Sequence, residues 1–383
     1  MRITEAKSLE LSFPPDSGFS SSHILFYSGR PDLSSLFPPA DSARNRLFVT
    51  DSTIASLEPC REFFFRFTGG RQASQLPAVY RDAADTLCVL GAGESFKTME
   101  NVLAIARAAL DSNFNRNCLF VSIGGGVLCD MTGFAASIFK RGVDVEFVPT
   151  TLLADVDAAI GGKTGCDFGS YKNMIGSFYP ARNIHIWSGF VQSLPQKEFI
   201  SGLGEVIKTA LLFSRELTDI LKARADAVLG RNQELLEKMI FICAQAKAKT
   251  VHEDFREHGK RSFLNYGHTF AHALESAAGL GTVTHGEAVA WGIARALDLS
   301  RMTGRCSGQF AAECKELLSS YGYDIRPVPG ALQGMPGAQQ KLLEAMHKDK
   351  KNSSSRVKVI LQSGAQETHI TEVSDSELCG ALQ

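Results

Sequence analysis

The sequence lacks the features that mark a membrane, secreted or nucleic-acid-binding protein. No uncharged apolar run reaches membrane-spanning length, and the start, MRITEAKSLELSF, has acidic residues where an export signal would have basic ones. The 40 basic and 41 acidic side chains leave a net charge of −1, so no overall field attracts nucleic acid or anionic membranes. We therefore expect a cytoplasmic protein whose partners include neither nucleic acid nor a membrane.

Paired cysteines are missing as well. The nine cysteines are scattered and none forms a Cys-x-x-Cys pair, in a chain too large to depend on disulfide bonds. We expect reduced thiols that bind no metal.

A chain of 383 residues exceeds what one hydrophobic core usually supports, so two domains are expected. Up to about residue 180, apolar strand patterns such as RLFVTDS (46–52) alternate with helical ones, which indicates a parallel sheet covered on both faces. Beyond that point long helical patterns dominate. The predicted fold is an α/β N-terminal nucleotide-binding domain (1–180) followed by an all-α, or mainly helical, C-terminal domain (181–383).

A glycine turn in the first half predicts a nucleotide site. CLFVSIGGGVLCDMTGFAASIF (118–139) is typical of a strand, a turn at Gly124–Gly126 and a helix whose first amides can approach a phosphate. The G-x-G-x-x-G spacing of a dinucleotide fold is absent, because no glycine stands at 129. Asp51, at a strand tip, and Asp130, early in the helix, are ribose contacts or ordinary surface acids. Lys163, inside a second glycine segment, has the setting of a phosphate-binding lysine.

Three of the nine histidines fall between residues 268 and 285. His268 and His272 are four apart and would share a helix face, so they are candidate ligands of one metal, with buried core histidines as the alternative. The glycine break after this helix would let His285 and Glu287 return to the same cavity. Glu205, in an apolar helical run, needs a partner, which is either Lys208 three residues on or a metal.

Seven segments then resemble one known family in order and spacing. They are GESFK, GGGVLCDMTGF, KRGVDVEFVPTTLLADVDAAIGGKTG, YKNMIGSFYP, GLGEVIK, the 247–287 block and KDKK. Together they resemble 3-dehydroquinate synthases over roughly residues 46–362. Ala158-Ala159, where two serines are usual in the family, and Ala92, where proline is common, are departures that remove no charged group.

The resemblance implies an enzyme that uses NAD and a zinc or cobalt ion, and we expect a homodimer. The implied reaction converts the sugar phosphate 3-deoxy-D-arabino-heptulosonate 7-phosphate to 3-dehydroquinate and phosphate, in the shikimate pathway of aromatic amino acid biosynthesis. It implies the metal ligands Glu205, His268 and His285, with His272 kept for substrate or proton transfer, in place of a His268–His272 pair.

The same resemblance assigns the other site residues. The expected substrate or catalytic residues are Arg141, Asp157, Lys163, Lys172, Asn173, Lys208, Lys247, Arg261, Asn265, His272 and Lys351. The expected NAD contacts are Asp51, Glu94, Lys97, Gly125, Gly126, Val127, Asp130, Thr150, Thr151, Lys163, Lys172 and Glu198.

Three other functions are alternatives to this one. Related cyclases of the valiolone, desmethyl-gadusol and deoxy-inosose types act on sugar phosphates that lack this carboxylate. The groups expected to receive the carboxylate are all present and favour the heptulosonate: Lys247, Arg261, Asn265, His272 and Lys351. A metal-dependent NAD polyol dehydrogenase would not need so many phosphate-binding lysines, and an inactive scaffold would not need the three candidate metal ligands.

Overall fold

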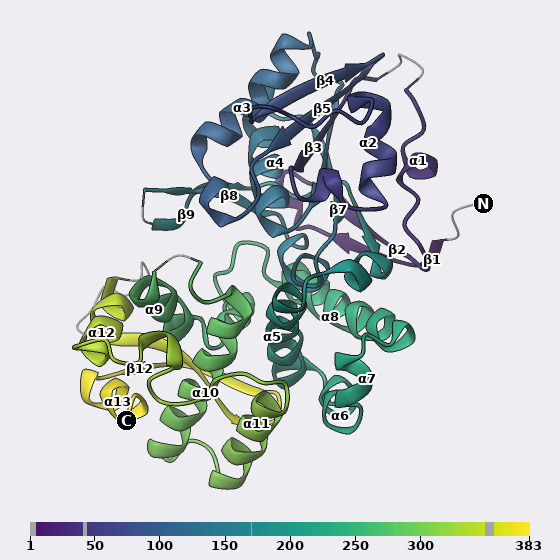
Figure 1. Ribbon diagram of the computed structural model, residues 1–383. Coiled ribbons are helices and arrows are strands. Elements are labelled where there is room, and N and C mark those ends of the chain that lie inside the picture. Colours follow the sequence, from purple (N-terminus) through teal and green to yellow (C-terminus); the bar gives the residue numbers. More distant parts are fainter. Residues whose placement is uncertain (1–4, 41–43, 170, 280, 349–355) are drawn as a thin grey trace. The chain divides into compact units, whose positions relative to one another are not determined.

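The computed structural model describes residues 5–40, 44–169, 171–279, 281–348 and 356–383, and the chain forms two compact units (Figure 1). The first unit comprises Met1–Leu194 with Lys247–Arg256, and the second comprises Pro195–Ala246 with Glu257–Gln383. No helix in the described ranges is long and apolar enough to cross a membrane.

An eight-stranded sheet forms the centre of the first unit. Its strand order is β1-β2-β10-β7-β6-β3-β5-β4. All neighbouring pairs are parallel except the two at the edges, β1 with β2 and β4 with β5. The strands are β1 (Glu5–Ser12), β2 (Ser21–Tyr27), β3 (Arg46–Asp51), β4 (Ala78–Asp82), β5 (Asp85–Leu90), β6 (Leu119–Gly124), β7 (Asp144–Pro149) and β10 (Asn183–Trp187).

The apolar runs of the central strands explain why they lie inside the sheet. Every residue of β5 and of β6 is buried, as expected of parallel strands covered on both faces. Helix α2 (Cys60–Thr68) contributes Phe63 and Phe67 to an aromatic cluster with Phe48 of β3. The other helices are α1 (Leu33–Leu36), α3 (Met99–Asp111) and α4 (Gly126–Ile138), and an antiparallel hairpin joins β8 (Lys163–Phe168) to β9 (Tyr171–Phe178).

The first unit extends past the predicted boundary at residue 180. Strand β10 begins at Asn183 and pairs in parallel with β2 and β7, so the sheet is complete only after it. The end of helix α8 (Gln233–Glu253) also belongs to this unit. Phe255, two residues after the helix, packs against Phe13, with 5.0 Å between the ring centroids.

The second unit is helical, which confirms the predicted combination of an α/β part and a helical part. Helix α10 lies at its centre and is buried at Gly286 and along most of Ala288–Leu299. Besides most of α8, the helices are α5 (Gln196–Phe213), α6 (Arg215–Ala223), α7 (Ala225–Leu229), α9 (His268–Ala278), α10 (His285–Met302), α11 (Gly308–Ser320), α12 (Ala338–Lys348) and α13 (Asp375–Ala381). One antiparallel hairpin, β11 (Val357–Gly364) with β12 (Glu367–Val373), makes the unit mainly helical rather than all-α.

Short helical turns lie between several of these elements. A π-helical turn, η5 (Ala154–Ala158), follows β7. The 3₁₀ turns are η1 (Pro15–Ser17), η2 (Ile54–Ser56), η3 (Glu94–Phe96), η4 (Phe139–Arg141), η6 (Ser188–Ser193), η7 (Lys260–Asn265) and η8 (Gly330–Leu332).

Candidate functional site

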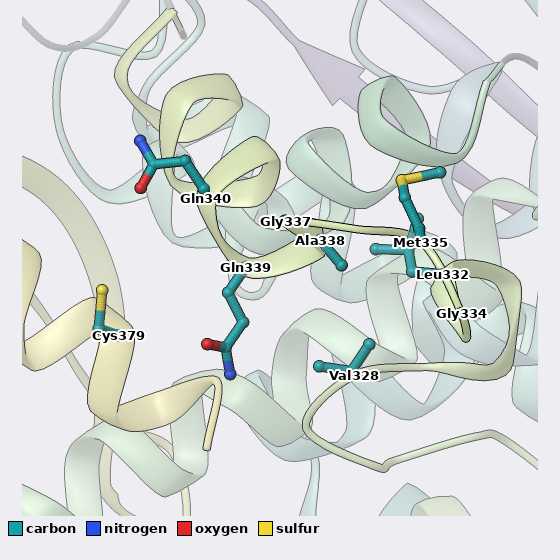
Figure 2. Close-up of a pocket in the computed structure, with 9 residues that line it drawn as sticks. All are labelled: Val328, Leu332, Gly334, Met335, Gly337, Ala338, Gln339, Gln340 and Cys379. Carbon is teal, nitrogen blue, oxygen red and sulfur yellow. The ribbon is translucent and has the colours of Figure 1, made fainter.

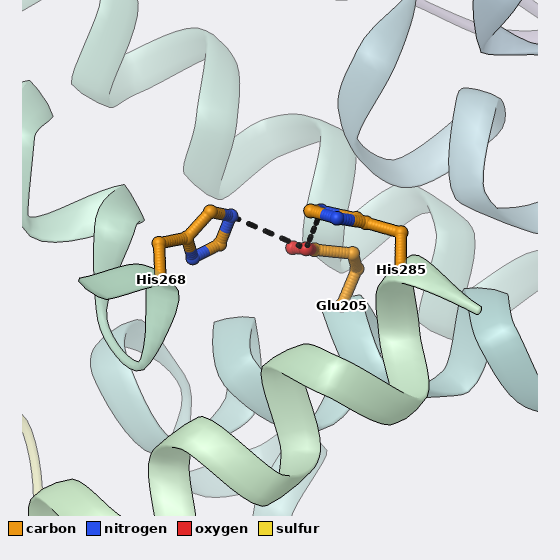
Figure 3. A group of neighbouring side chains, drawn as sticks. All are labelled: Glu205, His268 and His285. Atoms are coloured by element: carbon orange, nitrogen blue, oxygen red, sulfur yellow. Dashed lines mark ion pairs between the residues drawn. The ribbon is translucent and has the colours of Figure 1, made fainter. Parts of the chain in front are cut away.

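Glu205, His268 and His285 converge in the second unit (Figure 3), and one ligand atom of each lies within 4.8 Å of the others. His285 Nε2 is 3.3 Å and His268 Nε2 is 3.8 Å from Glu205 Oε1. One carboxylate and two imidazoles are an ordinary donor set for catalytic zinc and leave a coordination position open.

Glycines beside the three candidate ligands allow the helices that carry them to touch. A Cβ on Gly204 would lie 2.4 Å from the carbonyl oxygen of Gly286, and one on Gly286 would lie 1.8 Å from that of Ser201, so α5 and α10 meet backbone to backbone. Likewise, a Cβ on Gly292 would lie 2.1 Å from the carbonyl oxygen of Gly267, where α9 meets α10. These approaches are open only to glycine and bring Glu205, His268 and His285 together.

The charges around Glu205 stabilise its ionised form. Burial alone would raise the pKa of the Glu205 carboxyl, but the Lys208 ammonium and His285 outweigh it and lower that pKa to about 2. Burial would likewise lower the pKa of His285, whereas its contacts with Glu205 and Glu275 raise that pKa to about 10. Burial and the neighbouring Lys208 hold the pKa of His268 well below its usual range, so His268 is neutral and ready to act as a ligand.

The donor set fits a metal cation. Glu205 is 1 % exposed, and the groups facing its buried carboxylate oxygens are the Lys208 ammonium and the two imidazoles. The ion pair with Lys208 that the sequence allowed as an alternative is also present, so Glu205 has a cationic neighbour and faces the two imidazoles as well. A buried carboxylate arranged in this way suits a divalent ion.

His272 and Glu287 lie outside this group. His272 is exposed on α9, with its ring 5.5 Å from that of His268 between centroids, so the two histidines are neighbours but do not form a chelating pair. The expectation that Glu287 would face the same cavity is wrong. Its carboxylate accepts hydrogen bonds from the backbone N–H and side-chain hydroxyl of Thr284, which makes it part of a capping box at the start of α10.

Two further predicted substrate residues of the second unit lie in or at the end of η7. Arg261 is buried, at 1 % exposure, while Asn265 is half-buried and donates from its amide to a carboxylate oxygen of Glu257. Lys208 is equally buried beside Glu205. The second unit therefore has two buried cations that could neutralise an anionic ligand.

In the first unit, the start of α4 has the form of an anion-binding site. Gly125 occupies the N-cap position and so has no side chain to cap the helix, and the first-turn amides of Gly126 and Val127 have no acceptor within the helix. A Cβ on Gly125 would lie 3.2 Å from the side chain of Thr151, and Thr150 N–H donates to Gly124 O at 3.0 Å. Free amides at a helix start fit a pyrophosphate.

Two other predicted NAD residues lie at the ends of elements of the first unit. Asp51, at the end of β3, accepts hydrogen bonds from the N–H groups of Thr53 and Ile54, both at 2.9 Å, and burial raises its pKa. Glu94 forms an ion pair of 3.4 Å with Lys172. The structure thus holds Asp51 as a cap of a short turn and Glu94 as a partner of the hairpin β8–β9.

Lys97 and Lys247 each donate hydrogen bonds to polar groups of the first unit. Lys97 Nζ donates to Asp130 Oδ2 at 2.7 Å and to Asn173 Oδ1 at 2.5 Å. Burial would lower the pKa of Lys97, but Asp130 and Glu94 raise it, so the ammonium is retained. Lys247 Nζ donates to the carbonyl oxygen and the carboxylate of Asp157, at 2.6 and 2.5 Å.

Three of the remaining predicted residues are exposed. Lys163 is exposed at the start of β8, and Arg141 is exposed with φ of 69°. Glu198 is exposed in the first turn of α5. Lys351 lies outside the described residues.

Sequence reasoning missed Glu275. This residue of α9 is 5 % exposed, and its Oε1 lies 3.6 Å from His285 Nδ1. Its position seven residues after His268 places it on the same helix face, but nothing in the sequence shows that His285 packs opposite it.

A separate hollow of about 480 Å³ opens elsewhere in the second unit (Figure 2). None of the predicted site residues lines it, and its polar side chains are limited to Gln339, Gln340 and Cys379. We place no chemistry there.

Solved structures share this fold along nearly the whole chain. A 2-epi-5-epi-valiolone synthase from Streptomyces hygroscopicus subsp. jinggangensis 5008, with NAD+ and Zn2+ bound, is 25 % identical and matches with a TM-score of 0.79, covering 100 % of this chain and 98 % of the other. A 2-deoxy-scyllo-inosose synthase complexed with carbaglucose-6-phosphate, NAD+ and Co2+ is 24 % identical and matches with a TM-score of 0.78, covering 98 % and 99 %. The chain therefore shares its fold with these two synthases.

Sequence comparison is more specific. Residues 87–201 match the 3-dehydroquinate synthase N-terminal family and residues 202–352 match the 3-dehydroquinate synthase C-terminal family. The 3-dehydroquinate synthase of Francisella tularensis subsp. mediasiatica (strain FSC147) is 36 % identical over 95 % of this chain and 92 % of its own length. That of Acidithiobacillus ferrooxidans (strain ATCC 53993 / BNL-5-31) is 38 % identical over 91 % of each. The chain belongs to the 3-dehydroquinate synthase family, as its motifs predicted.

Proposed function

We propose that the chain is an NAD- and metal-dependent carbon–oxygen lyase that converts 3-deoxy-D-arabino-heptulosonate 7-phosphate to 3-dehydroquinate and phosphate. The observation that carries this proposal is the convergence of Glu205, His268 and His285 beside the buried Lys208, in a chain of this family. The fold alone would also suit cyclases of other sugar phosphates.

The second unit would hold the metal through Glu205, His268 and His285. When bound, the metal supplies Lewis acidity at substrate hydroxyls and NAD supplies an oxidation and the matching reduction. Lys208 lies against Glu205 and is a fixed positive charge of the second unit. It would favour the oxygen anion that forms when a hydroxyl beside the metal loses its proton.

The substrate is a polyanion in a protein of almost no net charge, so its carboxylate and phosphate need local cations. We assign Arg261 to the carboxylate, because a guanidinium offers two parallel donors to it. The other proposed substrate contacts are Arg141, Asp157, Lys163, Lys172, Asn173, Lys208, Lys247, Asn265, His272 and Lys351.

The first unit would bind NAD, with its pyrophosphate on the amides at the start of α4 and its ribose hydroxyls on carboxylates at the strand ends. Those amides have no intrahelical acceptors, which supports this placement. The proposed contacts are Asp51, Glu94, Lys97, Gly125, Gly126, Val127, Asp130, Thr150, Thr151, Lys163 and Lys172, with Glu198 as a further candidate.

His272 and Asn265 would position the substrate or relay protons rather than act as a strong general base. His272 is exposed beside His268, and Asn265 has no titratable group. The phosphate of the substrate can serve as its own base as it leaves, and the closing carbon–carbon bond needs mainly a held conformation.

The test is incubation of the full chain with the heptulosonate phosphate, catalytic NAD and Zn2+ or Co2+, following phosphate release and product mass. We expect one phosphate per product, the mass of 3-dehydroquinate and no accumulation of NADH. A sugar phosphate without a carboxylate is the matched control. Faster turnover of that control would favour a valiolone-type activity, and net NADH from a simple polyol would favour a dehydrogenase.

We further propose a homodimer. Light scattering on the purified chain should give twice the chain mass of 41.5 kDa. A mass of one chain at micromolar concentration would contradict it.

A further inference from the structure

Glu275 is a buried carboxylate of the second unit to which the proposed mechanism gives no role. It lies near the end of α9, seven residues after His268, so both side chains project from the same face of the helix. Its Oε1 is 3.6 Å from His285 Nδ1, while His285 Nε2 points to Glu205 Oε1 at 3.3 Å. The imidazole of His285 therefore stands between two carboxylates, one on each ring nitrogen.

His268 shows the same arrangement with a different acceptor. Its Nδ1 lies 3.2 Å from the carbonyl oxygen of Tyr266, and its Nε2 points to Glu205 Oε1 at 3.8 Å. Both candidate ligands thus present Nε2 to the shared point and Nδ1 to an oxygen acceptor. A ring nitrogen held by an acceptor keeps its proton and leaves the other nitrogen as the ligand.

We propose that Glu275 is a positioning residue for the metal site, its carboxylate facing His285 Nδ1–H and attracting that proton, which fixes the tautomer and the ring orientation that present Nε2 to the metal. This inference rests on the proposed function, which places the metal at Glu205, His268 and His285.

The two acceptors differ in charge, which makes Glu275 the more influential one. The Tyr266 carbonyl only orients His268, whereas a carboxylate also adds negative charge beside the metal and strengthens the imidazole as a donor. The helix packing holds Glu275 in place, because α9 and α10 touch at Gly267 and Gly292. Glu275 is 5 % exposed, so little water competes for the contact.

The test is metal binding by the full chain, measured as Zn2+ and Co2+ affinity in competition with a chelator, without substrate or NAD. Glu275→Met removes the acceptor and keeps the length of the side chain, and should weaken binding by about 10- to 100-fold. Glu275→Gln keeps an acceptor oxygen and loses the charge, and should lose less. The absorption bands of bound Co2+ should shift in both variants, since the donor strength of His285 changes.

Two controls separate positioning from a structural role. Asp298→Asn neutralises a carboxylate of α10 that pairs with Arg295 and Lys315, and should leave both affinities unchanged. In a His285→Ala background, Glu275→Met should cause no further loss, because the residue acts through His285.

Equal affinities of the wild type and Glu275→Met, or the same loss with and without His285, would overturn this inference alone. Failure of the wild-type chain to bind either ion would overturn the proposed metal site together with it.

Discussion

Arg261 is the residue that best separates substrate binding from metal binding. It is buried in η7 and is not part of the metal group, so Arg261→Ala should leave the metal content unchanged while kcat/KM falls. A lost charge-assisted contact in a dry site is worth about 2–4 kcal/mol, or roughly thirty- to a thousand-fold. Arg261→Lys should recover little, because one ammonium cannot reproduce two parallel donors. Steady-state kinetics beside metal analysis checks this.

Arg295 provides the matched control for that variant. It is as buried as Arg261, but its guanidinium pairs with Asp298 and donates to backbone carbonyl oxygens of Ile325 and Ala381. Arg295→Lys should lower thermal stability and spare kcat/KM at a permissive temperature. Normal turnover of the heptulosonate by Arg261→Ala, or full rescue by lysine, would make a carboxylate-free sugar phosphate the better substrate.

Asp155 predicts an effect of pH on stability. It is 0 % exposed in η5, neither of its oxygens has a hydrogen-bond partner in the described structure, and burial raises its pKa well above the usual range. With the folded pKa above the unfolded value of about 3.9, its contribution to stability is complete below that pH and is lost as pH rises toward the folded pKa. Asp155→Asn removes this loss.

We expect Asp155→Asn to be more stable than the wild type near neutral pH, because the buried amide has no charged form, and the gain is about 1.4 kcal/mol for each pH unit between the unfolded and the folded pKa. The difference should grow from pH 5 to pH 8 in thermal unfolding. The matched control is Asp219→Asn, a 68 % exposed side chain whose ion pair with Arg215 is worth little. A difference that shrinks as pH rises would contradict the assignment.

The motifs predicted the metal-group residues Glu205, His268 and His285, but they could not predict Glu275 or the burial of Asp155. Spacing along a helix indicates which side chains share a face, not what the neighbouring helix places opposite them. Glu275 faces His285 only because α9 and α10 pack at Gly267 and Gly292. From the sequence alone, a glycine in a helical pattern indicates only an unfavourable helix position, because the helix that packs against it is not known.

At the scale of elements, the contact of α5 with α10 should control metal affinity. Gly286→Ala would put a Cβ 1.8 Å from the carbonyl oxygen of Ser201, so the helices must separate and Glu205 moves away from His285. Overpacking costs about 1–3 kcal/mol. If this cost reduces the free energy of metal binding, the Kd for the metal rises roughly 5- to 150-fold. Chelator competition with Zn2+ measures this change.

Gly308→Ala is the control for helix propensity. Gly308 is the first residue of α11 and has no atom within 4 Å of an added Cβ, so alanine there should be neutral or stabilising. Unchanged zinc affinity in Gly286→Ala would mean that the contact between α5 and α10 does not determine how Glu205 and His285 are placed.

At the scale of the molecule, the sequence predicted the order of the two parts but not their boundaries. Apolar runs such as those of β5 and β6 identify buried strands without reference to the rest of the chain. The boundary depends instead on pairing between distant segments. Strand β10 joins β2 across more than 150 residues, and Lys247 returns to the first unit through its ion pair with Asp157.

The division into two units predicts separable ligand effects on stability. The proposed metal ligands all lie in the second unit and the amides of α4 in the first, so Zn2+ and NAD should each raise the unfolding temperature of the wild type. A ligand at a hundred times its Kd contributes about 2.7 kcal/mol, or roughly 5 °C or more for domains of this size. His268→Ala should lose the Zn2+ shift and keep the NAD shift, whereas Gly126→Val, at the start of α4, should do the reverse. Calorimetry of each variant with each ligand alone measures these shifts in unfolding temperature. Loss of both shifts in both variants would show that the two proposed sites are not independent.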